Sequence, residues 1–450
     1  MTKPAALHQY LQNYAAAAKW RLIAGDTENV SQVIVIPAYA EIEMLFATLA
    51  SLARNHPSLL ADSLVLCVVN NKPGCPATVK KNNHQTMAYL HELVNKSGCA
   101  GLHPDENMKS YLHLIRSSRL RLGYIDASTP GYEIPEKDGG VGTARKIGMD
   151  MALRLFSPEV SLKKLIISLD ADTLVPVNYL AAIKNRFTSD IKTAVIAYEH
   201  QEPMEERAKE GIYCYEIFLR YWLLGLQYAK SPYAFHSIGS ALVCSADAYL
   251  AVRGMNRRAA GEDFYFLNKL AKLGRIEYIR ETHVYPSARV SRRVPFGTGK
   301  RMQQFLAGEQ KEYILYDPQI FKILAKWLLL MEKSLDSGES EILKKASSIH
   351  PLLFSFLTAC GFGRAWTSLR RNIKDEEALI RHFHCWFDGF RTLKLINYLT
   401  RQAYPPQNMF GALREILAVQ KIAVPEFIPA GGHADLARQK LIVQYLRALT

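Results

Sequence analysis

Two aspartates at the end of an apolar run are the first residues whose spacing suggests chemistry. Residues 165–172, LIISLDAD, read as a strand that ends on Asp170 and Asp172, separated by one alanine. Residues two apart in an extended chain point to the same side, so both carboxylates could bind Mg²⁺ or Mn²⁺, which in turn could hold a diphosphate. An exposed turn that uses aspartate for its hydrogen-bonding habit is the alternative interpretation. A DxD pattern alone does not separate the two.

The elements that must position these carboxylates alternate between strand and helix. Apolar, β-branched runs predict strands, most of them followed by a polar loop and a segment with helical spacing, at residues 33–36, 63–70, 121–127, 165–172, 193–200 and 240–246. Such alternation predicts the α/β class with a mostly parallel sheet flanked by helices. In these sheets, ligands bind beyond the carboxyl ends of the strands, where the strand order reverses. The two aspartates stand at such a strand end.

The chain divides into three parts by its patterns. We expect an N-terminal helical extension over residues 1–30, an α/β domain over residues 31–304 and an α-helical C-terminal region over residues 305–450. The aromatic segment 211–229 reads as a largely buried helix within the second part. Beyond about residue 305 only helical patterns follow, and no strand signal intervenes.

The bulk composition narrows the partners and the compartment. Lysine plus arginine exceed aspartate plus glutamate by 56 − 42 = 14, which favours nucleotides, phosphates, nucleic acid or an anionic membrane surface. Seven cysteines without a CxxC pattern suggest neither a disulfide framework nor a zinc site. No secretion signal or spanning helix is visible. We expect a cytoplasmic protein and leave open a peripheral contact with the inner face of the membrane.

Further motifs surround the two aspartates in a recognisable order. They are PAYAE at 37–41, VNN at 69–71, GGVGTARKIGMD at 139–150 and GED at 261–263. Together with the DAD segment, they resemble the family-two glycosyltransferases of the GT-A fold over roughly residues 31–300. The resemblance implies a GT-A type sheet and a metal-dependent, hexosyltransferase-like enzyme. Such an enzyme moves a sugar from a nucleotide diphosphate donor to an acceptor hydroxyl, with inversion, using Mg²⁺ or Mn²⁺ held by DxD.

The resemblance also assigns roles to individual residues. Those that would bind the donor are Pro37, Tyr39, Glu41, Asn70, Asn71, Arg145 and Asp170. Asp170 and Asp172 would hold the metal, and Asp263, beside Glu262, would be the general base that removes the proton of the acceptor hydroxyl. Ala40 stands where the family has asparagine, and Asn70 and Asn71 stand where it often has aspartate. The base of the donor, UDP or GDP, therefore stays open.

A basic segment follows the GED motif. From Arg289 to Arg301 it holds five cations and no acid, which suits a loop that closes on a diphosphate or on an anionic acceptor. The residues proposed for this contact are Arg289, Arg292 and Arg293. His283 could be a third metal ligand, although a lone histidine is more often structural.

Two other functions compete with this interpretation. A nucleotidyltransferase acting on a sugar phosphate typically has a glycine-rich basic loop after the first strand, and PAYAEIE has neither glycine nor lysine. A non-catalytic protein that binds nucleic acid or a membrane surface would explain the net charge but not the DAD and GED motifs. We therefore expect a UDP- or GDP-sugar as the donor and no nucleic-acid partner, and the sequence does not specify the acceptor.

Overall fold

The computed structural model describes residues 3–96, 103–156, 163–188, 190–291, 297–308 and 313–450. By internal packing, these residues form two compact units. The sheet unit consists mainly of Met1–Gln201 and Ser237–Ser287, and the helical unit consists mainly of Glu202–His236 and Gly297–Thr450.

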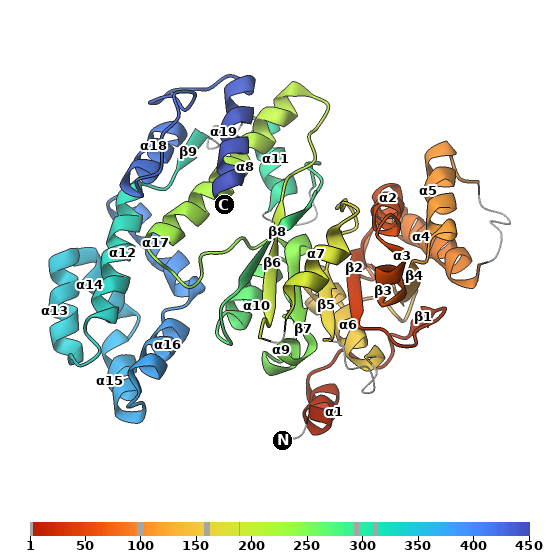
Figure 1. Cartoon of the computed structure of the whole chain (residues 1–450), viewed down its shortest axis with the longest axis horizontal. Coiled ribbons are helices and arrows are strands. Elements are labelled where there is room, and N and C mark those ends of the chain that lie inside the picture. The colour runs from red at the N-terminus through yellow and green to blue at the C-terminus, as the bar shows by residue number, and fades with distance from the viewer. Residues whose placement is uncertain (1–2, 97–102, 157–162, 189, 292–296, 309–312) are drawn as a thin grey trace. The chain divides into compact units, whose positions relative to one another are not determined.

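An eight-stranded sheet forms the centre of the sheet unit (Figure 1). Its strands are β1 (Leu22–Ala24), β2 (Gln32–Ala38), β3 (Ser63–Asn70), β4 (Arg121–Ala127), β5 (Leu165–Ser168), β6 (Thr193–Tyr198), β7 (Leu242–Ser245) and β8 (Glu277–Val284). Their order is β1-β4-β3-β2-β5-β7-β6-β8. β2 is parallel to β3 and β5, β3 to β4, and β6 to β8, whereas the other three pairs are antiparallel. β2, β3 and β5 are buried along their whole length, as their unbroken apolar runs predict for strands covered on both faces.

The strand order reverses between β2 and β5. The chain proceeds from β2 to β3 and β4 on one side, and then returns to place β5 on the other side of β2. Val35 of β2 is the register partner of Ser168 of β5, and the Leu169 amide donates to the Val35 carbonyl at 3.1 Å. The two strands therefore end side by side, at the position where doubly wound sheets bind their ligands.

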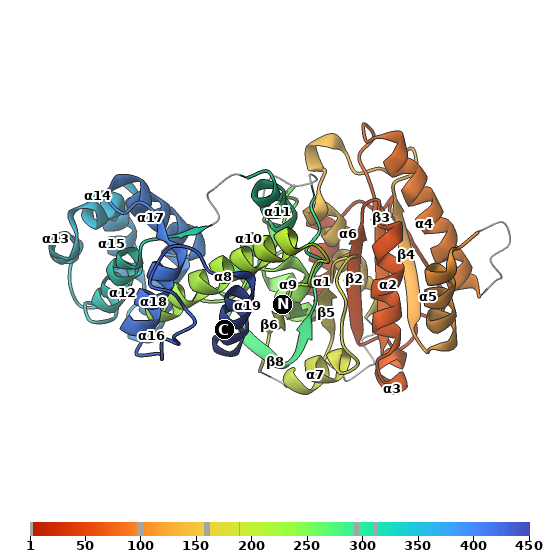
Figure 2. The same cartoon turned by 90° about the horizontal axis from the view of Figure 1, so that it is seen from above.

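Helices flank this sheet (Figures 1 and 2). They are α1 (Lys3–Asn13), α2 (Ile42–Ala53), α3 (Pro57–Ala61), α4 (Ala77–Asn95), α5 (Glu106–Ser117), α6 (Val141–Leu155), α7 (Tyr179–Arg186), α9 (Ala246–Ala251) and α10 (Glu262–Leu270). α6 lies directly on β2 and β3, because a Cβ at Gly148 would be 3.0 Å from the Val68 side chain and closer still to that of Val35. A glycine in α6 thus brings this helix against the strands next to the reversal.

Two strands of the eight-stranded sheet lie where no strand was expected. β1 falls within the expected helical extension 1–30, of which α1 is the helical part, and it pairs antiparallel with β4. β8 occupies residues 277–284, EYIRETHV, whose charged residues conceal the strand pattern. Both are edge strands, and an edge strand needs fewer apolar residues because one side has no strand neighbour.

The helical unit contains the aromatic helix α8 and the C-terminal helices. Its elements are α8 (Glu206–Tyr228), α11 (Thr298–Leu306), α12 (Pro318–Glu332), α13 (Glu339–Ile349), α14 (Pro351–Ala359), α15 (Phe362–Asn372), α16 (Glu376–Trp386), α17 (Gly389–Gln402), α18 (Met409–Val419) and α19 (Leu436–Leu449), with two short strands, β9 (Ile314–Leu315) and β10 (Gln407–Asn408). These two strands, which no sequence signal indicated, pair with each other.

Aromatic side chains form the core of this unit. Trp327 of α12 contacts Phe362, Phe383 and Phe387 edge to face, with ring centroids 5.4–5.9 Å apart. α8 packs on α12, and Gly225 accommodates the ring of Phe321, which a Cβ would meet at 2.5 Å. The helix predicted over residues 211–229 exists, but it belongs to this unit and not to a continuous domain over residues 31–304.

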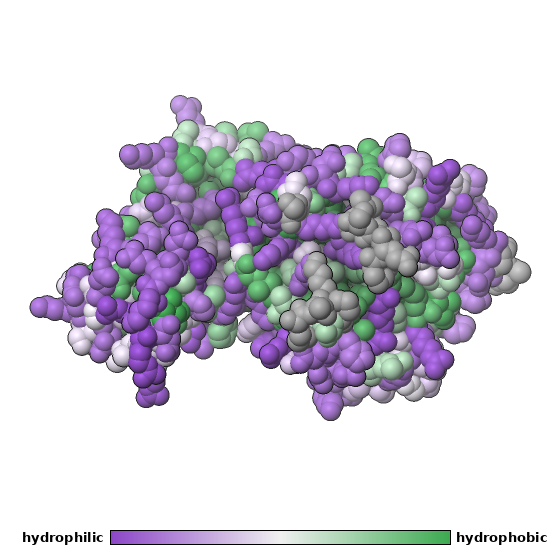
Figure 3. Space-filling model, turned by 60° about the horizontal axis from the view of Figure 1, so that its bottom comes forward, coloured by the Kyte–Doolittle hydropathy of each residue, from purple (hydrophilic) through white to green (hydrophobic). Residues whose placement is uncertain are grey.

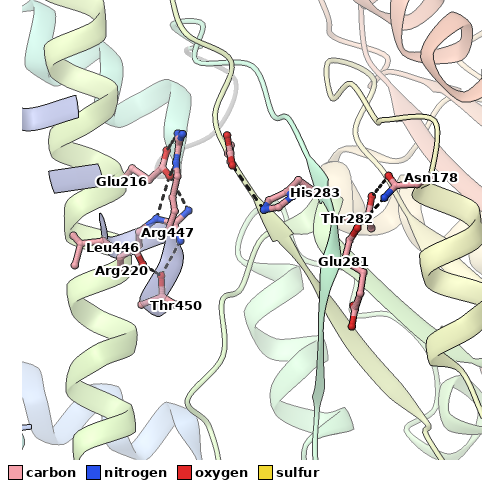
Figure 4. Close-up of polar contacts among 10 residues, drawn as sticks. Asn178, Glu216, Arg220, Glu281, Thr282, His283, Leu446, Arg447 and Thr450 are labelled. Atoms are coloured by element: carbon pink, nitrogen blue, oxygen red, sulfur yellow. Dashed lines mark hydrogen bonds and ion pairs between the residues drawn. The ribbon is translucent and has the colours of Figure 1, made fainter. Parts of the chain in front are cut away.

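A buried ion-pair network joins α8 and α19 within the helical unit (Figure 4). Glu216, 1% exposed, accepts hydrogen bonds from Arg220 at 2.7 Å and from Arg447 at 2.7 Å. Arg220 also donates to the hydroxyl of Thr450 at 2.7 Å. Each buried charge therefore has an opposite charge beside it, as burial in a low dielectric requires.

The predicted fold class is confirmed: an α/β protein with a mostly parallel sheet flanked by helices and an α-helical C-terminal region. No helix in the described part of the chain has the length and apolar character needed to cross a membrane. The face drawn in Figure 3 is mainly hydrophilic, and its apolar residues lie in small separate areas.

Candidate active site at the ends of β2 and β5

The acidic turn directly follows β5. Ala171 is buried at 2% exposure, whereas Asp170 and Asp172 on either side of it are partly exposed. The Thr173 amide donates to the Asp170 carbonyl at 3.2 Å and closes the turn. The strand predicted over residues 165–172 therefore ends at Ser168, and the DAD motif forms a turn and not an extended chain. Within this turn the alanine is buried and both aspartates are partly exposed.

Arg145 of α6 connects this turn to α10. Its guanidinium pairs with the carboxylate of Asp170 through one nitrogen and with that of Glu262 through the other. The side chains of Arg145 and Glu262 are 4% and 3% exposed, and that of Asp170 is 31% exposed. Paired, charge-assisted hydrogen bonds of this kind are what allow a guanidinium to be buried.

Asp263 adds a second carboxylate from the start of α10. Its side chain accepts a hydrogen bond of 2.7 Å from the Phe264 amide. Burial raises the pKa of Asp263, the neighbouring Arg145 opposes the rise, and the Asp170 carboxylate contributes to it. Arg145, Asp170, Glu262 and Asp263 thus form one electrostatically connected group, which we call the Arg145 cluster.

Glycines make this cluster possible. A Cβ at Gly239 would lie 2.7 Å from Cζ and 2.9 Å from Nη1 of Arg145, and closer still to Nη2. At the first turn of α6, a Cβ at Gly142 would lie 2.5 Å from the carbonyl oxygen of Arg258 and 2.9 Å from Cβ of Glu262. The Gly142 amide donates to that Arg258 carbonyl at 3.2 Å. These glycines let α6 begin against the loop that precedes α10.

The segment after β2 lies at the same edge of the sheet. Pro37 is buried inside β2, Tyr39 is partly exposed, and Glu41 is 7% exposed just before α2. Between them, Ala40 has φ of 51°, a left-handed conformation uncommon for alanine. The side-chain oxygen of Asn83 on α4 accepts a 2.9 Å hydrogen bond from the Ala40 amide and helps to hold this conformation.

Asn70 and Asn71 bond to the main chain around them. Asn70 Nδ2 donates to the carbonyls of Ala38 and Val68, both at 3.1 Å. Asn71 Nδ2 donates to the carbonyls of Lys72 at 3.1 Å and Ser128 at 3.2 Å. Both residues are buried, at 6% and 1% exposure. Their side-chain amide nitrogens hold the ends of β2, β3 and β4 together. Recognition of a nucleotide base by Asn70 and Asn71 stays a prediction.

The third predicted metal ligand lies on the edge strand β8. His283 Nε2 is 3.7 Å from the carboxylate of Glu199, and its place on the strand is drawn in Figure 4. Among the described residues, no group of three or more His, Cys, Asp or Glu side chains could hold a metal ion. A metal site composed of Asp170, Asp172 and His283 therefore stays a prediction.

The basic segment is only partly described. Arg289 is half-buried, while Arg292 and Arg293 lie outside the described residues. The proposed contact of these three arginines with a diphosphate or an acceptor stays a prediction.

Sequence reasoning missed residues that support the acidic turn. Gln201 Nε2 donates to the carbonyls of Asp172 at 2.9 Å and Tyr285 at 2.6 Å. Leu174 and Tyr285 form an isolated β-bridge beside it. Gly239 was likewise overlooked as a residue that matters to Arg145. No sequence signal points to Gln201 or Gly239, because their partners are tens of residues away in the chain.

Comparison with known structures gives several distant matches. A mannosyltransferase, PcManGT, from Pyrobaculum calidifontis, solved with GDP-Man and Mn²⁺, shares 13% identity over 88% of this chain and 92% of that chain, with a TM-score of 0.35. TarS 1-349 of S. aureus shares 12% identity over 94% of this chain and 92% of that chain, with a TM-score of 0.34. The structure of TarS 1-349 in complex with UDP-GlcNAc shares 11% identity over 75% of this chain and 92% of that chain, with a TM-score of 0.33. Because these TM-scores are low, the fold assignment rests on the strand order.

Comparison of the sequence with protein families gives one match that bears on the site. No curated protein matches the chain. The family model described as glycosyl transferase family group 2 matches residues 165–369. The matched segment begins at β5, includes the DAD and GED motifs, and continues into the helical unit. The family recognised from the order of the motifs is thus confirmed over this segment: residues 165–369 are a glycosyl transferase family group 2 segment.

Proposed function

We propose that this chain is an inverting glycosyltransferase that moves a sugar from a nucleotide diphosphate donor to an acceptor hydroxyl. The observation that carries the proposal is the Arg145 cluster at the reversal of strand order. There, carboxylates from the turn after β5 and from α10 meet a buried guanidinium from α6, and these carboxylates lie within the segment that matches a glycosyltransferase family. This position is where open α/β sheets bind nucleotides.

The charges around the turn fit a divalent cation. Three carboxylates, those of Asp170, Glu262 and Asp263, accompany the guanidinium in the Arg145 cluster, so the fully ionised cluster has a net charge of 1 − 3 = −2. Oxygen ligands and excess negative charge suit Mg²⁺ or Mn²⁺. Asp170 and Asp172, both partly exposed, would hold the ion. When bound, it would stabilise the negative charge of the departing diphosphate.

The chain's own residues divide the remaining tasks. Asp263 would accept the proton of the acceptor hydroxyl, and its raised pKa makes it a stronger base than an ordinary aspartate. Glu262 would hold Arg145 in place from the buried side. Arg145, which lies against Asp170, would orient the donor diphosphate and balance part of its charge. Pro37, Tyr39 and Glu41, which follow the neighbouring strand, would contact the nucleoside.

A donor panel tests this proposal. The full-length chain is incubated with UDP- and GDP-sugars and Mn²⁺ or Mg²⁺, and release of the nucleoside diphosphate is measured. We expect release with one donor class, loss of at least a hundredfold in rate in Asp172→Ala, and no loss in Asp336→Ala, which removes an exposed carboxylate of the helical unit. If the wild type neither cleaves nor binds any donor, the proposal is wrong. Release of pyrophosphate from a nucleoside triphosphate and a sugar phosphate would favour a nucleotidyltransferase instead.

A further inference from the structure

A stripe of polar residues on α2 faces the segment that carries the two aspartates. Thr48, Ser51 and Asn55 follow one another at intervals of three and four residues, so they lie along one face of the helix and its C-terminal end. All three are buried, at 0%, 8% and 3% exposure. Buried hydroxyl and amide groups destabilise a helix face unless they form hydrogen bonds, so each of these residues should have a specific partner.

The partners follow in order along the chain after β5. Thr48 Oγ1 donates to the carbonyl of Ala171 at 2.9 Å, and Ser51 Oγ accepts from the Val175 amide at 3.1 Å. Asn55 donates to the Pro176 carbonyl at 3.3 Å and accepts from the Leu180 amide at 2.9 Å. Every partner is a main-chain group. Two side chains of α2, and Asn55 just beyond it, therefore hold the main chain of residues 171–180.

The first of these bonds lies within the DAD motif. Ala171 is the residue between Asp170 and Asp172, so a shift of its carbonyl would move both carboxylates together. On the other flank, the Gln201 side chain donates to the Asp172 carbonyl, and the main chain of Tyr285 forms a β-bridge with that of Leu174. Further along the segment, Asn178 bonds to Thr282 and Glu281, as Figure 4 shows. The turn is thus fixed from two sides before any ligand binds.

We propose that Thr48 and Ser51 are positioning residues that hold the main chain of the acidic turn, and with it the Asp170 and Asp172 carboxylates, in place for a shared divalent cation. The inference rests on the proposed function. Its physical basis is preorganisation: ligands held in place by supporting hydrogen bonds bind a metal more tightly, and loss of such a support typically weakens binding 10- to 100-fold. A hydroxyl that served stability alone would leave cation affinity unchanged when it is removed.

The test compares three buried hydroxyls. Thr48→Val removes the donor to Ala171 and keeps the branched shape, and Ser51→Ala removes the acceptor for Val175. Ser63→Ala is the matched control, because Ser63 is also buried and donates to the Leu59 carbonyl at 2.7 Å, but it begins β3 at the opposite end of the strands. Mn²⁺ binding to the full chain with UDP or GDP is measured by the electron paramagnetic resonance of free Mn²⁺, without an acceptor. Thermal midpoints are recorded in parallel.

We expect all three variants to melt a few degrees lower, by about 2–4 °C. Only Thr48→Val and Ser51→Ala should weaken Mn²⁺ binding, by about tenfold or more, and Thr48→Ser should restore the wild-type affinity. If these variants bind Mn²⁺ as tightly as Ser63→Ala does, the positioning role is refuted while the proposed function stands. If the wild type itself binds no Mn²⁺ with either nucleotide, both the metal site and this inference are wrong.

Discussion

Replacement of Gly239 by alanine tests whether the burial of Arg145 serves catalysis. The added Cβ would lie 2.7 Å from Cζ and 2.9 Å from Nη1 of Arg145, distances that no real carbon adopts without a shift. The guanidinium is the mobile end of a flexible side chain, so the backbone can stay in place while Arg145 moves. Any such movement separates it from Asp170 and Glu262.

The size of the effect follows from these two ion pairs. A hydrogen bond to a charged group contributes about 1.5–3 kcal/mol. Loss of one such contact to the reacting complex lowers kcat/KM by about 10- to 150-fold, since about 1.4 kcal/mol corresponds to a factor of ten. Glu262, 2% exposed, would also lose its partner, which costs about 1–3 kcal/mol of folding stability.

The assay is kcat/KM for the donor together with urea denaturation. Gly211→Ala is the matched control, because its Cβ would lie 2.8 Å from Cδ1 of Phe305, also a flexible side chain, within the helical unit. We expect Gly239→Ala to lose activity far beyond its loss of stability and Gly211→Ala to lose stability alone. Wild-type kcat/KM in a folded Gly239→Ala variant would refute the role of Arg145.

Two further predictions concern Asp263 and the N-terminal helix. Asp263→Asn should lower kcat by about 10²- to 10⁴-fold with little change in donor KM, and should abolish the rise of wild-type kcat/KM with pH as Asp263 ionises. Because the folded-state pKa of Asp263 is raised above its unfolded value, its contribution to stability is full at low pH and is lost as pH rises through the folded pKa. The free energy of unfolding of Asp263→Asn minus that of the wild type, measured in urea, should therefore be larger at pH 8 than at pH 4. An equal difference at both pH values would contradict this. Tyr10→Phe removes the 2.6 Å hydrogen bond from α1 to the buried Asp150 of α6, and should reduce the free energy of unfolding by about 1–3 kcal/mol without changing donor KM, measured by urea denaturation and kinetics.

Local patterns were sufficient for the elements nearest the site. The runs predicted as strands over residues 63–70 and 121–127 are β3 and β4 to the residue. These elements follow from the spacing of apolar residues, which depends only on neighbours in the chain. β1 and β8 were missed because edge strands, one short and one rich in charged residues, do not show that spacing.

Residue type alone was less informative about the asparagines that follow β3. Asn70 and Asn71 have the donors and acceptors that a nucleotide base would use, and their position at a strand end suggested that role. In the folded chain, their amide nitrogens bond to the main chain of Ala38 and Ser128, among others. Those partners come from other strands, so no local pattern could have revealed them.

The sequence by itself determined that Asp170 and Asp172 lie just beyond a buried strand, because hydrophobic spacing is local. Only the tertiary structure decided that the carboxylates of Asp170, Glu262 and Asp263 lie around Arg145. That meeting depends on the return of the chain to place β5 beside β2, on the close approach of α6 at Gly142 and on the space left by Gly239. Such contacts are the joint result of packing among segments far apart in the chain, which the spacing within any one segment does not encode.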